Sequence, residues 1–432
     1  MKRWRNWAGN QYARPESWLK PRTTDEVAVA VKRAHADGRK VKVIGSGHSF
    51  TAAAVANDVL VDMSQISSCG AVDVATGTVE VGGGTTLAEL NVLLHSQGRA
   101  LANLGDIAYQ TVAGAISTST HGTGSTLTGM AAQVVGLTVV DGRGGVRRLE
   151  IGDAHSELFR SAQVSVGALG AITSVQLKTV PRFALEAVET PMRLKDVLAN
   201  LDEHVASNDH FEFFWIPHTG WALTKRNNRT GAPLAPMPKA REWYQKSFLE
   251  NTAFGAVCQV GKIAPQLVPR LAKALPATGT TRYIDESYRV FSSARRVKFV
   301  EMEYAIPREA CSEVLGRITK MIDMRGFKIG FPVEVRFTAA DTIPLSTSSE
   351  RESAYIAVHM FKGVEYTSYF TAVAEIMADY AGRPHWGKMH FLGVNELEPL
   401  YPEWQLFQGA RRILDPDGTF ENEYSRRIFG AL

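Results

Sequence analysis

The segment with the clearest chemical potential is a glycine-rich turn at residues 45–50, which reads Gly-Ser-Gly-His-Ser-Phe and follows an apolar strand expected at residues 41–44. Backbone N–H groups of such a turn can bind an anion such as a pyrophosphate. The imidazole of His48 would lie beside any group bound there. The turn alone is a weak signal, because many Gly-x-Gly sequences only close a tight turn and most loop histidines are solvated.

A second segment rich in small and hydroxylated residues spans 111–124. Its backbone and hydroxyl donors are numerous enough to follow a long polyphosphate ligand, and the two segments together indicate a dinucleotide. The chain has no Gly-x-Gly-x-x-Gly that opens a helix after a strand, so binding in the Rossmann manner is not expected. A P-loop, a Gly-x-Ser-x-Gly elbow and a His-Glu-x-x-His motif are also absent from the sequence.

The second half of the chain places an acid and a cation two residues apart in a strand expected at 333–337. The period of two puts Glu334 and Arg336 on one face. This spacing alone favours a surface ion pair of little energetic value. The alternative is an acceptor and a fixed cation that face a cavity, shared with His359 if the strand at 355–361 is an antiparallel neighbour. A single histidine in such a strand is more often a hydrogen-bonded core residue.

A loop at residues 383–390 brings together Lys388, His385 and His390. The two imidazoles lack a Glu-x-x spacing and a convincing third ligand, so no metal site is expected. Lys388 is the stronger candidate, because a lysine near a bound anion or a desolvated hydroxyl can stabilise alkoxide character or act as a base. Most lysines, however, simply point to water.

Composition places the chain among ordinary globular proteins with two domains. It has 432 residues, of which 45% are hydrophobic and 21% charged. Cys69, Cys258 and Cys311 suggest neither a disulfide framework nor a cysteine metal site, which favours a reducing compartment. The net charge of +4 is spread along the chain, so a nucleic-acid partner is not expected.

The N-terminal residues 1–7 are basic and aromatic but are not followed by the apolar core of a secretory signal. No uncharged apolar stretch is long enough to span a bilayer. The sequence therefore favours a cytoplasmic protein, and peripheral membrane contact stays compatible with it.

Local patterns predict alternating short helices and strands up to a domain boundary near residue 182. Beyond it we expect an antiparallel sheet with helices on one side, and a long loop over residues 225–241. Two Thr-x-x-Glu capping boxes, at Thr23 and Thr86, mark helix starts. Strands are expected at 41–44, 59–63, 134–141, 146–149, 174–180, 299–305, 333–337 and 355–361, a hairpin at 71–74 and 78–81, and helices at 27–36, 86–95 and 308–325.

With the segments 45–50, 111–124 and 384–388 and the pair Glu334-x-Arg336 in order, the chain resembles the aldonolactone oxidoreductases of the vanillyl-alcohol-oxidase flavoprotein class. These include L-gulono-1,4-lactone and D-arabinono-1,4-lactone oxidases, and alditol oxidases are close relatives. The resemblance covers nearly the whole chain. It implies an α+β fold with three parts: a PCMH-type FAD-binding domain of two α+β subdomains (1–182), a substrate or cap domain with an antiparallel sheet and flanking helices (183–380), and a C-terminal segment returning to the FAD domain (381–432).

The resemblance implies bound FAD, attached through the 8α-methyl group of the flavin to His48. Plant galactonolactone dehydrogenases lack this histidine. Thr111 stands where alditol oxidases have a serine near the substrate. The implied cofactor contacts are Gly45, Ser46, Gly47, His48, Ser49, Phe50, Gly105, Asp106, Thr111, Val112, Gly114, Ala115, Ser117, Thr118, Thr120, His121, Gly122, Gly170, Ile172 and His385.

The implied reaction is oxidation of a sugar 1,4-lactone at its C2 hydroxyl. Glu334 and Arg336 match the pair that grips the substrate, while Lys388 and His359 match pocket residues of alditol oxidases. The hydroxyl would lose its proton towards a group near Lys388 or His359, and hydride would pass from C2 to flavin N5. The 2-keto lactone would enolise to an ascorbate-type product, and oxygen (giving H2O2) or another acceptor would reoxidise the flavin. The alternatives are an alditol oxidase acting on xylitol or sorbitol, and a non-catalytic flavin-binding protein.

Overall fold

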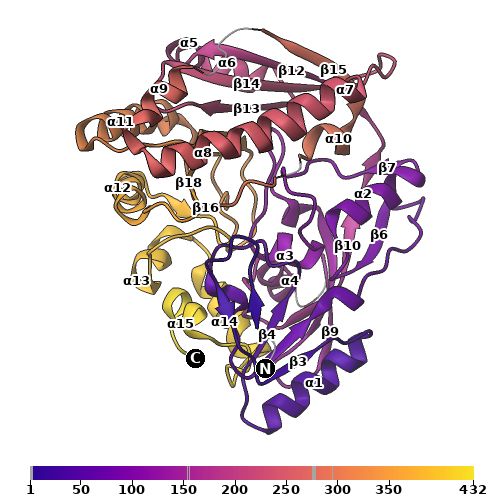
Figure 1. Ribbon diagram of the computed structural model, residues 1–432. Coiled ribbons are helices and arrows are strands. Elements are labelled where there is room, and N and C mark those ends of the chain that lie inside the picture. The colour runs from indigo at the N-terminus through magenta and orange to yellow at the C-terminus, as the bar shows by residue number, and fades with distance from the viewer. Residues whose placement is uncertain (1–2, 153, 155, 275–278, 294) are drawn as a thin grey trace.

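The computed structural model describes all residues except 1–2, 153, 155, 275–278 and 294. Two sheets dominate the half that contains the glycine-rich turn (Figure 1). One is parallel, with strand order β3 (Ser17–Leu19), β5 (Val59–Asp62), β4 (Val41–Ile44). The other is antiparallel, with order β6 (Thr78–Gly82), β10 (Ala171–Lys178), β8 (Val134–Val140), β9 (Val146–Glu150). Two short pairs, β1 (Trp4–Arg5) with β2 (Tyr12–Ala13) and β7 (Arg99–Ala100) with β11 (Val180–Pro181), complete this half.

The helices of this half start where the capping boxes predict. Thr23 Oγ1 accepts a hydrogen bond from Glu26 N–H, and Thr86 forms the full reciprocal box with Glu89. Such caps satisfy N–H groups that have no partner within the helix. The helices are α1 (Thr24–Ala36), α2 (Leu87–Ser96), α3 (Val112–Ser117) and α4 (Ser156–Gln163).

The expected hairpin at residues 71–74 and 78–81 is wrong in its first strand. Residues 71–74 form no strand, because Asp73 Oδ1 accepts hydrogen bonds from Ala75 N–H and Thr76 N–H and so bends the chain. The segment still pairs with β6, because Asp73 N–H donates to the Thr78 carbonyl at 2.8 Å and Gly70 N–H donates to the Glu80 carbonyl at 2.9 Å. The predicted partner is therefore correct, although the first arm is irregular, and β6 also pairs with β10, about ninety residues further along the chain.

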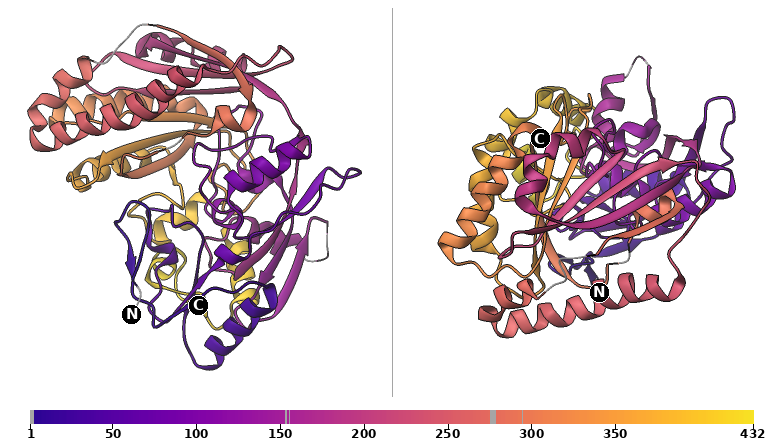
Figure 2. Two further views of the ribbon diagram at one scale, coloured as in Figure 1. Left: turned by 45° about the vertical axis from the view of Figure 1, so that its right-hand side comes forward. Right: turned by 90° about the horizontal axis from the view of Figure 1, so that it is seen from above.

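The second half is built on one eight-stranded antiparallel sheet, as expected, but its helices are not confined to one side of the sheet (Figure 2). The strand order is β15 (Thr281–Glu286), β12 (Ala184–Arg193), β14 (Trp221–Thr230), β13 (His210–Trp215), β17 (Val333–Thr338), β18 (Ser353–Phe361), β16 (Phe299–Pro307), β19 (Arg383–Pro384). α11 (Cys311–Arg325) and α12 (Thr367–Ala378) share an apolar core with one face of the sheet. The remaining helices of this half are α5 (Leu194–Ala199), α6 (Leu201–Ala206), α7 (Lys239–Glu242), α8 (Phe254–Ile263), α9 (Val268–Lys273) and α10 (Ser287–Phe291).

The long loop expected at residues 225–241 is wrong. Its first six residues continue β14, which pairs with β12 along ten residues, and its last residues begin a helix that runs on through a π-helical segment, Trp243–Ala253, into α8. The polar sequence of β14 resembles a loop because its side chains face other charged groups. Lys225, for example, pairs with Glu189 on the neighbouring strand.

The C-terminal segment begins at the sheet edge and packs back onto the first half. β19 pairs with β16, and α14 (Trp404–Leu414) and α15 (Glu423–Phe429) join the same apolar core as α2, α3 and α4. α13 (Val394–Leu397) lies between them in the chain. In Figure 1 these yellow helices lie beside the indigo and violet elements. We propose the divisions 1–182, 183–380 and 381–432 as the domain organisation of the chain.

Candidate functional site

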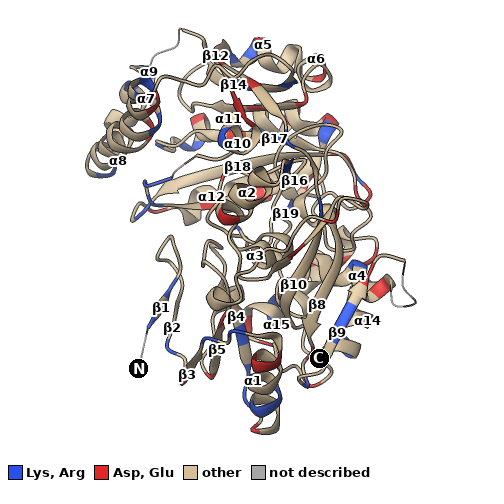
Figure 3. Ribbon diagram, turned by 90° about the vertical axis from the view of Figure 1, so that its right-hand side faces the viewer, with Lys and Arg blue, Asp and Glu red and all other residues tan. Residues whose placement is uncertain are grey.

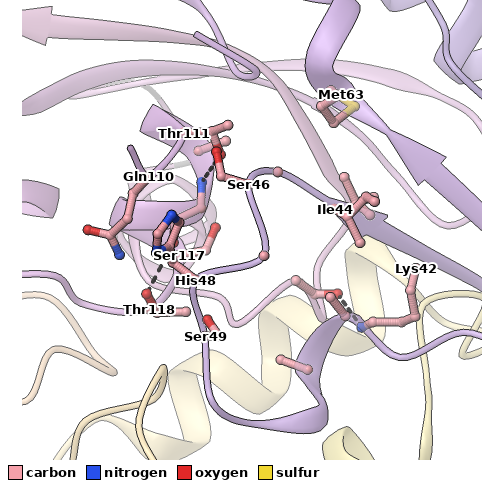
Figure 4. Close-up of a pocket in the computed structure, with 18 of the residues that line it drawn as sticks. Lys42, Ile44, Ser46, His48, Ser49, Met63, Gln110, Thr111, Ser117 and Thr118 are labelled. Carbon is pink, nitrogen blue, oxygen red and sulfur yellow. Dashed lines mark hydrogen bonds between the residues drawn. The ribbon is translucent and has the colours of Figure 1, made fainter. Parts of the chain in front are cut away.

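The glycine-rich turn after β4 lines an open cleft in the first half of the molecule. Figure 4 shows His48 beside Ser117 and Thr118 on one side, with Ile44 and Met63 further along. Both small-residue segments therefore meet in one place, as expected of two parts of a dinucleotide site. Of the proposed cofactor contacts, the cleft is lined by Gly45, Ser46, Gly47, His48, Ser49, Thr111, Gly114, Ser117, Thr118, Gly170 and Ile172.

The cleft is formed by backbone that excludes side chains at specific positions. A Cβ atom on Gly45 would lie 2.1 Å from Thr111 Oγ1. Gly47 and Gly170 have φ values of +69° and +140°, which favour glycine. Bare backbone along one wall and hydroxyl donors along the other fit an elongated polyphosphate group such as FAD.

His48 is partly buried beside the N-terminal segment. Its ring stacks on Trp7 with centroids 5.8 Å apart, and Lys298 Nζ lies 3.9 Å from the Trp7 ring. Burial, with the nearby charges of Lys298 and Lys388, lowers the pKa of His48 to about 4. The imidazole is therefore neutral at neutral pH.

Lys42 also lines the cleft and was not selected from the sequence. Its ammonium donates to the carbonyl oxygens of Gly167 and Phe420 at 3.0 and 2.9 Å, which ties β4 to the C-terminal segment. Burial lowers its pKa to about 8 against the opposing charge of Asp415. A lone lysine within the apolar strand at 41–44 was the signal that could have revealed it.

The other proposed cofactor contacts lie outside the lining of this cleft. Phe50 packs against Trp7 and Phe299, and Val112 and Ala115 lie within α3 and are buried in the core. These three side chains therefore pack into the interior and do not line the cleft. Thr120 accepts a hydrogen bond from Gln110, and Gly105 packs close to the His121 carbonyl. Asp106, His121, Gly122 and His385 lie toward the large sheet, where charged groups gather.

Arg336 forms the centre of one charged cluster on the sheet face opposite α11 and α12. Its Nε donates to Glu212 Oε2 at 2.7 Å, and its terminal nitrogens lie 2.5 Å from Glu334 and 3.5 Å from Asp106. Burial raises the pKa of Glu334. The charge of Arg336 acts to lower this pKa, whereas the charge of Asp106 raises it further. Arg295 binds the same Asp106 carboxylate. The structure thus makes Glu334 and Arg336 a buried pair rather than a surface ion pair.

Lys388 and His359 form a second cluster around Glu301. Glu301 binds the Lys388 ammonium and lies 3.4 Å from His359 Nε2, while His359 Nδ1 donates to the Pro332 carbonyl at 3.1 Å. Burial alone would raise the pKa of Glu301, but Lys388 and His359 lower it to about 2. The same pairing raises the pKa of Lys388 despite its burial.

Strand register explains why the two clusters share one face. Glu334 pairs with Ala357 on β18, and Ala357 and His359 are two residues apart. Glu301 and Glu303 on β16 pair with His359 and Ala357. Neither glutamate was predicted as a site residue, although the two show the same period of two as Glu334 and Arg336.

His121, Glu303 and His385 bring three ligand-type side chains within 4.8 Å of one another, which the sequence did not reveal. His121 Nε2 lies 3.2 Å from Glu303 Oε1, and His385 Nδ1 accepts the Gly387 N–H at 3.0 Å. The latter bond leaves the proton of a neutral His385 on Nε2, so that nitrogen has no lone pair for a cation. Burial alone would raise the pKa of Glu303, but His121 lowers it well below its ordinary value. The arrangement therefore fits a charge network better than a metal centre.

Comparison with known proteins identifies the family. Residues 175–428 match the family described as D-arabinono-1,4-lactone oxidase, and residues 15–150 match the FAD binding domain. The L-gulono-1,4-lactone dehydrogenase of Mycobacterium tuberculosis is 41% identical over 428 residues, covering 99% of both chains. The L-gulonolactone oxidase of Bos taurus is 32% identical over 436 residues, covering 99% of this chain and 98% of the other.

Solved structures confirm the predicted α+β fold. Cholesterol oxidase from Brevibacterium sterolicum superposes with a TM-score of 0.82 at 16% identity, covering 99% of this chain and 96% of the other. At this identity the likeness concerns the fold alone. The matched family and its FAD binding domain agree with the glycine-lined cleft and the charged sheet face. The chain therefore belongs to the D-arabinono-1,4-lactone oxidase family and is an FAD-linked oxidoreductase.

Proposed function

We propose that the protein oxidises a sugar 1,4-lactone of the L-gulono or D-arabinono type at its C2 hydroxyl and forms an ascorbate-type product. Catalysis would take place where the His48 turn meets the charged sheet face. The observation that carries the proposal is the contact between these two parts. Phe50 N–H donates to the Gly387 carbonyl at 2.7 Å, and Lys388 Nζ lies 5.5 Å from the Phe50 ring.

The cofactor residues of this proposal are those of the cleft. Backbone N–H groups of the 45–50 turn and hydroxyl groups of Thr111 and Thr118 would hold FAD, and His48 would carry the covalent 8α-histidyl bond. Its neutral imidazole at neutral pH has the lone pair that such a bond requires. When bound, the flavin supplies the chemistry of accepting a hydride.

The residues proposed to bind the substrate have separate roles in the reaction. Arg336 and Lys388 are cationic and would donate hydrogen bonds to the lactone and to the reacting oxygen, which favours alkoxide-like character. The raised pKa of Lys388 argues against a lysine base. His359 donates through Nδ1 to a carbonyl, so its Nε2 can take the hydroxyl proton, and Glu301 would stabilise the imidazolium formed.

The test is anaerobic reduction of the purified holoprotein by a panel of lactones and alditols. We expect bleaching of the flavin by gulono- or arabinono-1,4-lactone, followed by readmission of air and assay of H2O2 to identify an oxidase. Reduction by xylitol or sorbitol alone would replace the proposal with an alditol oxidase. Reduction by no polyol or lactone would indicate a non-catalytic flavin protein.

A cytoplasmic location stays part of the proposal. Among the described residues, no helix is both long and apolar enough to cross a bilayer.

Figure 3 shows basic and acidic segments interspersed along the ribbon, including the strands that carry the site. The substrate is therefore proposed to be a small molecule rather than a nucleic acid.

A further inference from the structure

A row of alternating charges leads away from Arg336 across the large sheet. Glu189 pairs with Lys225 in the register of β12 and β14, and Lys225 pairs with Glu212 in the register of β14 and β13. Glu212 in turn accepts the hydrogen bond from Arg336. Neighbouring strands lie about 4.8 Å apart, so this row reaches roughly 15 Å beyond the proposed reaction site.

A second cavity lies over this row. Its walls include Arg336 and Asp106 at one end and Tyr283 of β15 at the other. It is separate from the cleft that holds the 45–50 turn, and the proposed reaction uses only its Arg336 end. The row and the cavity together form a polar channel to which the proposed reaction assigns no function.

Polar groups in this cavity lack partners within the described part of the chain. Two buried hydroxyl groups of its lining, those of Ser292 and Ser293, have no hydrogen-bond partner among the described residues. The Lys225 ammonium also lines the cavity, and its ion-pair partner Glu189 is 3.7 Å away, beyond hydrogen-bond distance. Buried polar groups are normally satisfied, so the two hydroxyl groups indicate a polar occupant.

The charges of the cavity specify a neutral occupant. Four carboxylates, those of Asp106, Glu189, Glu212 and Glu250, line it with the cations Lys225, Lys246 and Arg336. Outside the lining, Arg295 binds Asp106 and Glu334 binds Arg336, which brings the totals to four cations and five carboxylates. An anionic sugar acid or sugar phosphate would meet a site without excess positive charge, whereas hydroxyl groups can both donate to carboxylates and accept from ammonium and phenol groups.

We propose that this cavity binds the uncharged polyhydroxyl side chain of the substrate, with Lys225 and Tyr283 as its hydrogen-bond donors. The proposal rests on the proposed function, since it takes the lactone ring to lie beside Arg336. The length of the row then determines how long a hydroxylated tail the cavity can bind. It therefore predicts a preference for lactones that carry a tail over those that lack one.

Binding of two lactones that cannot be oxidised at C2 tests the proposal. A 2-deoxyhexono-1,4-lactone carries the tail, and 3-hydroxy-γ-butyrolactone keeps the ring hydroxyl but lacks the tail. Isothermal titration calorimetry of the holoprotein should give at least about tenfold tighter binding of the tailed lactone, the magnitude of one or two charge-assisted hydrogen bonds. Lys225→Met and Tyr283→Phe should each remove most of this preference.

Glu186→Gln is the matched control for the row. Glu186 lies on β12 as Glu189 does but pairs with Arg282 at the surface, outside the cavity lining. This variant should keep the preference for the tailed lactone. Melting temperature and flavin content verify that each variant is folded.

Two results would overturn the subsite. One is equal affinity of the native holoprotein for both lactones, and the other is an equal loss of affinity for both in Lys225→Met and Tyr283→Phe, which would make the row purely structural. Flavin reduction by gulonolactone distinguishes the two proposals. Reduction without a tail preference removes the subsite alone, whereas a tail preference without reduction removes the oxidation alone.

Discussion

The Thr111 hydroxyl occupies the space that a side chain on Gly45 would need, since a Cβ atom there would lie 2.1 Å from Thr111 Oγ1. Thr111 Oγ1 also accepts the Gly114 N–H at 3.3 Å and so caps α3. The hydroxyl therefore cannot turn away without exposing the start of that helix. This contact joins the two small-residue segments of the cofactor cleft.

Replacing Gly45 by alanine should close the cleft. The added methyl overpacks against Thr111, which typically costs about 1–3 kcal/mol, and displaces the turn that carries His48. We expect Gly45→Ala to lose most of its flavin, measured as the ratio of flavin to protein absorbance. Gly316→Ala is the control, because its Cβ meets open space within α11. Full flavin content in Gly45→Ala would show that the contact does not govern cofactor binding.

Replacing His48 by alanine should turn tethered flavin into dissociable flavin. The native polypeptide is expected to stay yellow after acid precipitation, while His48→Ala should release its flavin into the supernatant. His35, on the surface of α1, provides the control variant His35→Ala, which should stay yellow. A colourless native precipitate would refute the tether but leave non-covalent binding intact.

The sequence located much of this site because its signals are local. A period of two was enough to put Glu334 and Arg336 on one face, and the antiparallel strand at 355–361 brought His359 beside them. The N-caps at Thr23 and Thr86 likewise start helices where expected, and Thr86 completes the predicted capping box. Each of these inferences needs only neighbouring residues.

The rest depends on partners that are distant in the sequence. Glu212 and Lys225 join the site only through the register of β13, β14 and β17, and the polar sequence of β14 was interpreted as a loop. The sequence was equally unable to show which of these charged side chains are buried. Whether Glu334 and Arg336 form a surface pair or a buried one depends on the loops that cover the sheet, which a strand pattern does not encode.

Arg336→Met should damage stability and turnover together. It leaves Glu212 and Glu334 as buried carboxylates without their cation, which typically costs about 3–5 kcal/mol. Arg336→Lys keeps a charge but loses the planar fork, so we expect a smaller loss of stability and a decrease of about 10²–10³ in kcat/KM for a sugar lactone. Denaturant unfolding and steady-state kinetics measure the two effects.

A surface ion pair provides the comparison for the Arg336 variants. Arg317 bonds Asp379 with both side chains substantially exposed, so Arg317→Met should cost at most about 1 kcal/mol and leave turnover unchanged. Unchanged turnover in Arg336→Lys and in Glu334→Ala would remove that pair from the proposed mechanism.

His390 should make the fold less stable in acid. Its Nε2 lies 2.8 Å from the Tyr424 hydroxyl of α15, and burial, with the charge of Arg427, lowers its pKa from 6.5 to about 3. As pH falls below 6.5, the unfolded chain binds a proton that the folded chain does not, so stability decreases between pH 6.5 and about 3. One such group changes the free energy of unfolding by up to about 1.4 kcal/mol per pH unit.

His390→Gln removes this titration, so the variant should lose less stability than the native protein over the same pH range. Denaturant unfolding at a series of pH values measures both slopes. His385 titrates in the same sense, with its pKa lowered to about 3, and so retains part of the acid sensitivity in the variant. Identical slopes in the two proteins would mean that His390 takes up its proton without unfolding, and that its bond to Tyr424 does not hold the C-terminal segment against acid.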